Sequence, residues 1–165
     1  MTVRIAGPAR RGGLPAVDRR LLRSRAARLL RELSRNAAKP SETRKAKPLP
    51  ARSELSILLA DDAAIAELNQ GFRGKRRPTD VLSFSLLEGE YADYRGALLG
   101  DVVIGIETAA RQARSRRRSL DDEVTRLLIH GILHLLEYDH QRSDQARQMR
   151  AEERRLWRLL KSGDG

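Results

Sequence analysis

The sequence predicts one α+β domain, in which a small mixed β-sheet of about four strands is covered by helices. The chain has 165 residues, which suits a single domain (residues 1–165) with a sizeable core. Segments with strand-like alternation and segments with helical periodicity follow one another along it. Their predicted order, β-α-β-α-β-β-α-α-α, favours this class.

The N-terminal third is expected to hold one strand and one helix. A short edge strand is expected over 2–6, and the glycines and proline of 10–15 break it. A helix is expected over 16–35, because leucines recur there near the helical period while arginines occupy the other face. Residues 36–53 are rich in proline and lysine, which indicates an exposed, mobile basic loop. The sequence leaves open whether this loop binds something or is only an insertion.

The next segments predict a strand, a helix and a basic loop. Residues 54–60 alternate between apolar and polar side chains, as a strand does. Asp61 can cap a helix over 62–70, and Gly71 can end it. Residues 72–80 then form a basic, proline-containing loop that carries Arg73.

The second half is expected to contain two strands and three helices. The strands are 81–86 and 98–104, joined by the polar connection 87–97. A helix over 106–117 follows, and the last helix runs from 143 to about 160.

All three histidines lie in one window: His130, His134 and His140. Since the chain has no cysteine, a transition metal would find its ligands here. His130 and His134 share one face of an apolar helix that Ser119 can cap, with their Cβ atoms about 5–6 Å apart. His140 lies six residues after His134, beyond any single helical face, so the chain must turn to bring His140 close to the other two histidines. The window therefore predicts a three-histidine metal site at the end of a buried helix.

Three histidine ligands are typical of a catalytic zinc ion, because the fourth position stays open for water or substrate. Such an ion can lower the pKa of its water to about 7, or neutralise a phosphoryl oxygen. The alternative is that the histidines are core residues bonded to the backbone. A zincin protease would have Glu after its first helical histidine, but this chain has Gly131.

The net charge of +11 is concentrated at the N-terminus. Residues 1–53 hold 15 Lys and Arg against 3 Asp and Glu, whereas residues 54–165 hold 18 against 19. Such a basic block can attract the phosphate backbone of a nucleic acid. The alternative is that these arginines only lie on helix faces that are exposed to water.

Nothing in the sequence points to a membrane. No apolar run reaches the roughly 18–20 residues of a membrane helix. Residues 1–6 lack the apolar stretch of a secretory signal. We therefore expect a cytoplasmic protein with no membrane partner.

Three stretches resemble the YbeY-type endoribonucleases, the bacterial rRNA maturation factors. The family signature HGxLHLxGYDH matches HGILHLLEYDH at 130–140. The pattern LNxxYRxxDxPTDVLSF matches LNQGFRGKRRPTDVLSF at 68–84, and LGDVVI at 99–104 resembles the family strand LGDIxI. Three positions depart from these patterns: Phe72 replaces a tyrosine, Arg76 an acidic residue and Glu137 a glycine.

The resemblance implies that His130, His134 and His140 bind one zinc ion, and that Arg73 is the functional arginine near the metal. It also implies cleavage of single-stranded RNA in the maturation of the 3′ end of the small-subunit rRNA and in late ribosome quality control. Partners would be rRNA and the small ribosomal subunit with its associated factors. Two other readings stay open: a zinc hydrolase of another class, such as a peptidase, and a ribosome-associated RNA-binding protein with a structural metal.

Overall fold

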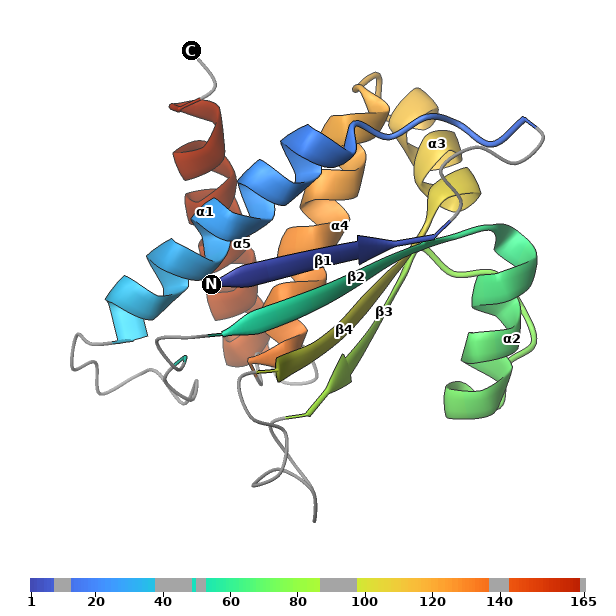
Figure 1. Cartoon of the computed structure of the whole chain (residues 1–165), viewed down its shortest axis with the longest axis horizontal. Helices are drawn as coiled ribbons and strands as arrows, with labels where there is room; N and C mark the ends of the chain where they lie inside the picture. The colour runs from blue at the N-terminus through green and yellow to red at the C-terminus, as the bar shows by residue number, and fades with distance from the viewer. Residues whose placement is uncertain (8–12, 38–48, 50–52, 87–97, 137–142, 164–165) are drawn as a thin grey trace.

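The computed structural model describes residues 1–7, 13–37, 49, 53–86, 98–136 and 143–163. Its elements follow the predicted order (Figure 1). They are β1 (Thr2–Ala6), α1 (Arg19–Ala37), β2 (Glu54–Ala60), α2 (Asp62–Arg73), β3 (Val81–Ser85), β4 (Leu98–Gly105), α3 (Ile106–Ser115), α4 (Leu120–Leu135) and α5 (Ser143–Lys161). Among these helices, none is long and apolar enough to span a bilayer.

The four strands form one mixed sheet in the order β1-β2-β4-β3. β2 pairs in parallel with β1 and β4, whereas β3 pairs antiparallel with β4. The predicted sheet is therefore confirmed, with β1 at one edge and β3 at the other.

The two faces of the sheet are covered unequally. One face packs on a large core to which α1, α3, α4 and α5 all contribute. The other face packs on α2 through a small cluster that includes Ile65, Leu82 and Val103. In Figure 1, α2 stands apart from α1, α4 and α5, which lie on the other side of the strands. α2 and α4 thus lie on opposite faces of the sheet.

α4 is capped as its sequence predicts, and hydrogen bonds from β3 hold its other end. The Ser119 hydroxyl accepts the backbone N–H of Asp122 at 3.1 Å. Near the other end of α4, the Ser83 and Ser85 hydroxyls of β3 donate to the carbonyls of Gly131 (3.1 Å) and Leu135 (3.2 Å). Most of the helix is buried. The sheet therefore fixes the position of the turns that carry His130 and His134.

The prediction that Gly71 ends the second helix is wrong. α2 continues to Arg73 and ends at Gly74, which has a left-handed conformation (φ 67°) and donates its N–H to the Gln70 carbonyl. Glycine inside a helix costs only about 1 kcal/mol relative to alanine, so one good cap further along outweighs it. Arg73 therefore lies in the last helical turn rather than in a loop.

The N-terminal helix begins three residues later than predicted, at Arg19. The Asp18 carboxylate accepts the N–H groups of Arg20 (2.9 Å) and Leu21 (3.0 Å), as an N-cap residue does. The helix also extends to Ala37, into the segment 36–53 that was predicted as a loop. Within that segment 38–48 and 50–52 lie outside the described residues, and Leu49 and Ser53 are buried rather than exposed.

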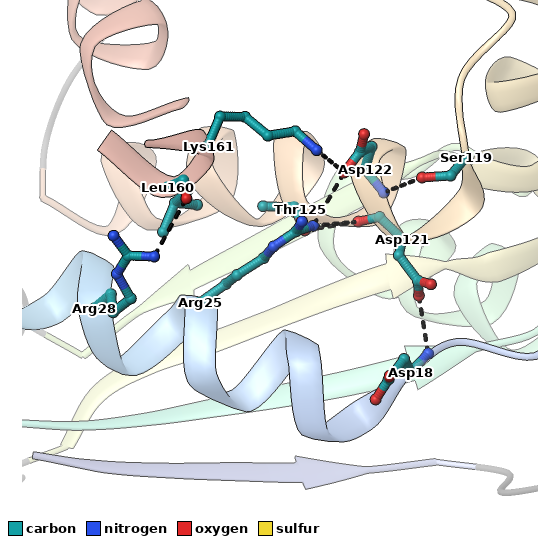
Figure 2. Close-up of polar contacts among 9 residues, drawn as sticks. All are labelled: Asp18, Arg25, Arg28, Ser119, Asp121, Asp122, Thr125, Leu160 and Lys161. Atoms are coloured by element: carbon teal, nitrogen blue, oxygen red, sulfur yellow. Dashed lines mark hydrogen bonds and ion pairs between the residues drawn. The ribbon is translucent and has the colours of Figure 1, made fainter. Parts of the chain in front are cut away.

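Some of the N-terminal basic residues hold the fold together (Figure 2). Arg25 is only 4% exposed and donates to Thr125 Oγ1 at 2.9 Å and to Asp122 Oδ1 at 3.2 Å. Arg28 donates to the carbonyls of Leu159 (3.0 Å) and Leu160 (3.2 Å) at the end of α5. These two arginines join α1 to α4 and α5, so they do not belong to a surface for a charged partner.

Candidate metal centre and its surroundings

His130 and His134 meet on one side of α4. Their Nε2 atoms are 3.0 Å apart, with ring centroids 4.6 Å apart in an edge-on arrangement. The predicted convergence of this pair is confirmed. His140 lies outside the described residues, so a three-histidine site stays a prediction. Within the described residues, no three His, Cys, Asp or Glu side chains are arranged so that they could hold a metal ion.

The histidine pair fits two positions of a tetrahedral ion. Nitrogen ligands bind zinc at 2.0–2.1 Å, which places two of them roughly 3.3 Å apart around the ion. The observed 3.0 Å differs from this separation by a few tenths of an ångström. Small side-chain rotations would therefore be enough for both rings to bind one ion, and α4 need not move.

Glu153 supports the ring of His130 from α5. The carboxylate Oε1 lies 2.6 Å from Nδ1 of His130. When Nδ1 donates its hydrogen to this carboxylate, Nε2 is left with a free lone pair on the side that faces His134. Glu153 was not predicted from the sequence. The available signal was an acidic residue four positions after the buried Met149, on the inner side of the last helix.

A cleft of about 310 Å³ opens beside His130. α4 and α5 form much of its lining, and the turn between α3 and α4 closes its far end. The lining residues are Asp80, Val81, Arg116, Arg118, Glu123, Arg126, Leu127, Ile129, His130, Glu153 and Trp157. Its volume is at the small end of the range for ligand sites, on the order of 300–1,000 Å³.

The far end of the cleft carries a buried carboxylate among arginines. Glu123 is 1% exposed and is paired with Arg116 and, at 3.1 Å, with Arg118. The guanidinium of Arg126 lies 3.9 Å above the ring of Trp157. Burial lowers the pKa of Arg126 below its usual value, and the charge of Arg118 lowers it further. The carboxylates of Glu123 and Asp122 act in the opposite direction and raise this pKa.

Arg73 is not in contact with the histidine pair. It is exposed at the end of α2, on the face of the sheet opposite α4. Within the described part of the chain, no hydrogen bond or ion pair joins Arg73 to either histidine. β3 lies between them, since Phe84 packs toward α2 and the neighbouring Ser83 bonds to α4.

The fold is shared with a solved protein. The solution structure of TM1509 from Thermotoga maritima has a TM-score of 0.56 and 25% sequence identity, over 98% of this chain and 93% of that one. This likeness covers nearly the whole α+β domain, and the shared class is an α+β domain built on a mixed sheet.

The sequence comparisons identify the family within that class. Residues 19–161 match the model of the family endoribonuclease YbeY. The endoribonuclease YbeY of Anaeromyxobacter sp. (strain Fw109-5) is 46% identical over 158 residues, which cover 96% of this chain and 71% of that protein. The endoribonuclease YbeY of Geobacter sulfurreducens is 42% identical over 113 residues, with coverages of 67% and 75%. The chain belongs to the YbeY endoribonuclease family, as its motifs predicted.

Proposed function

We propose that this protein is a zinc-dependent endoribonuclease that cleaves single-stranded RNA. Its place of action would be the cytoplasm, in the maturation of the 3′ end of the small-subunit rRNA and in late ribosome quality control. The small ribosomal subunit and its associated factors would be its partners. The observation that carries the proposal is the 3.0 Å approach of His130 and His134, in a chain of an endoribonuclease family.

His130, His134 and His140 would hold the ion. When bound, zinc supplies Lewis acidity toward a phosphoryl oxygen of the substrate. Glu153 keeps the His130 ring in the tautomer whose Nε2 can bind the ion. Ser83 anchors the helical turn between the two histidines through the Gly131 carbonyl. These contacts prepare the site before substrate arrives.

We assign Arg73 to phosphate binding. A guanidinium can bind two phosphate oxygens at once through parallel hydrogen bonds. Arg73 is exposed, and within the described part of the chain no carboxylate pairs with it. An exposed arginine with no carboxylate partner in the described part of the chain is more consistent with RNA binding than with a structural role.

The N-terminal helix supports the binding of an RNA strand through part of its charge. Four of its arginines remain exposed, and they are Arg20, Arg23, Arg31 and Arg35. Exposed cations attract a phosphate backbone without reading its sequence. Arg25 and Arg28 are excluded from this role because they bond inside the protein.

No observation favours the alternative of a peptidase-like hydrolase. That chemistry uses a glutamate directly after the first helical histidine. Here the position is Gly131, where a Cβ atom would lie 2.7 Å from Val102 Cγ1 and 3.1 Å from Ser83 Oγ. The close packing of α4 on the sheet therefore leaves no room for a general base at this position.

The test is cleavage of end-labelled RNA of one sequence, offered as a single strand and as a duplex. We expect the zinc-loaded protein to cut the single strand, and a chelator to abolish cleavage until zinc is restored. His130→Ala is expected to lose activity by orders of magnitude. Equal cleavage by metal-free protein would contradict the proposal, and so would activity on peptides but not on RNA.

A further inference from the structure

The end of α2 presents an aromatic ring to solvent. Phe72 is 66% exposed, although its ring centroid lies only 4.1 Å from that of Phe84 on β3. Among the described residues, the other exposed large apolar side chain is Met1, at 39%. One side of the Phe72 ring therefore packs on the protein, and much of the ring stays open to solvent.

Four cations follow the ring within five residues. Arg73, Lys75, Arg76 and Arg77 are all exposed, and no acidic residue occurs between 68 and 79. In the part of the chain that the structure describes, none of the four forms an ion pair. We call Phe72 and these four residues the Phe72 surface. Its charge is not neutralised within the described protein, so it favours a polyanion.

The Phe72 surface has a defined shape. Phe72 belongs to the last turn of α2, which Gly74 caps. The side chain of Asn69, 3% exposed, donates to the Arg77 carbonyl at 2.9 Å, and the Arg77 N–H donates to the Lys75 carbonyl at 2.9 Å. The turn that carries the cations is thus tied to the helix that carries the ring. A ligand would meet a largely preformed surface and lose little free energy in ordering it.

An exposed ring beside cations matches a single RNA strand more closely than the other polyanions. Unpaired bases stack on aromatic side chains while basic residues follow the backbone. In a duplex the base faces are already stacked on each other, so they cannot reach the ring. An acidic peptide would use the cations but has no need of the ring. The combination therefore points to an unpaired nucleotide.

We propose that Phe72 is a stacking platform for an unpaired base of the RNA substrate, and that Arg73, Lys75, Arg76 and Arg77 bind the phosphates on either side of it. This proposal rests on the proposed function and deepens it, because it states how a single strand is selected. The strand β3 links the platform to the metal centre. Phe84 supports the ring on one face, and the next residue toward the N-terminus, Ser83, bonds to the helix of the histidines on the other.

Because β3 is the edge strand of the described sheet, an RNA strand can pass around it from one face to the other. A layer packs about 10 Å from a sheet, so the path around the edge from the α2 face to the α4 face is on the order of 20 Å, which a few nucleotides can span. The platform would then hold a base a few nucleotides from the phosphate at the histidines.

The test is a binding scan with a short, fluorescently labelled single-stranded RNA, in chelator so that cleavage is blocked. Each nucleotide in turn is replaced by an abasic one. In wild-type protein, one position is expected to lose affinity by about 5- to 150-fold, the range for one stacked base. Phe72→Ala should bind the intact RNA more weakly by a similar factor. In this variant, no single abasic replacement should weaken binding by that factor.

Two conservative variants separate stacking from folding. Phe72→Tyr keeps an aromatic ring, so the same abasic position should weaken its RNA binding as in wild type. Phe72→Leu keeps apolar contact with Phe84 but has no ring, so its RNA affinity should match that of Phe72→Ala. The platform is overturned if Phe72→Ala binds intact RNA as wild type does, or if its scan is unchanged. It is also overturned if a polyglutamate peptide of equal charge binds as tightly as the RNA.

The two proposals can fail separately. RNA binding that depends on Phe72 in a protein that cleaves no RNA supports the platform and contradicts the proposed function. If the protein cleaves single strands but its RNA affinity does not change when Phe72 is replaced, the proposed function is supported and the platform is contradicted.

Discussion

The His130 Nδ1 atom lies 2.6 Å from Oε1 of Glu153, so a carboxylate of α5 orients a predicted metal ligand of α4. The two residues are 23 positions apart in the sequence. Acceptors of this kind fix the tautomer of a ligand histidine and typically contribute 10- to 100-fold to metal affinity. This contact therefore links the packing of two helices to the chemistry of the site.

Removing that acceptor should weaken metal binding more than it weakens the fold. We expect Glu153→Ala to lower zinc affinity by about 10- to 100-fold, measured by competition with a chelator. Glu153→Gln should restore much of it, because the amide oxygen can still accept from Nδ1. In the metal-free protein, nitrogen NMR of His130 should show a shift of tautomer in Glu153→Ala alone.

Glu152 provides the matched control. It is also a carboxylate of α5, but it pairs with Arg155, at 2.8 Å. Glu152→Ala should leave zinc affinity and the His130 tautomer unchanged. If both alanine variants lose zinc equally, the orienting role of Glu153 is wrong.

Adding a single methyl group at Gly131 should destabilise the protein. The new Cβ would lie 2.7 Å from Cγ1 of the buried, stiff Val102. Overpacking costs about 1–3 kcal/mol, against a gain of about 1 kcal/mol from replacing glycine in a helix. We expect a net loss of up to about 2 kcal/mol in urea unfolding. The loss should shrink when Gly131→Ala is combined with Val102→Ala, and a strictly additive pair would contradict the contact.

Two arginines of α1 should behave differently when they are changed. Arg25→Ala removes a buried cation from Asp122 and Thr125, and we expect a loss of about 3 kcal/mol in the free energy of unfolding (Figure 2). Arg23 is exposed on the same helix, so Arg23→Ala should change stability by less than about 0.5 kcal/mol. Equal effects in chemical denaturation would rule out the structural role of Arg25.

Occupation of the cleft should be visible in the fluorescence of Trp157. This residue is the single tryptophan of the chain, and it lines the cleft with Arg126 above its ring. If the strand reaches His130 along this cleft, single-stranded RNA should change the emission with the same midpoint as binding. An unchanged spectrum at saturating RNA would show that the strand avoids the cleft.

The sequence predicted the order of elements well because apolar side chains recur at helical or strand spacing in each segment. Ser119 marks the start of α4, and both the sheet and the order of elements were predicted. Gly71 misled the prediction, since a favourable cap three residues later extends α2. The burial of Arg25 could not be predicted either, because it depends on Asp122 and Thr125, which are distant in the sequence.

The candidate site was predicted in part. The four-residue spacing of His130 and His134 was enough to predict their convergence, because one helix determines it. Glu153 was missed because its role exists only once α5 packs on α4. Arg73 was expected close to the metal, but the sheet separates α2 from α4, a relation that no local pattern contains.

The most direct test is the zinc content of purified protein, measured by elemental analysis in wild type and in His140→Ala. We predict about one zinc ion per chain in the wild type, and its loss in the variant together with the loss of RNA cleavage. A His140→Ala protein that keeps its full zinc content would contradict the three-histidine site, and a zinc-free wild type that still cleaves RNA would contradict the proposed zinc dependence.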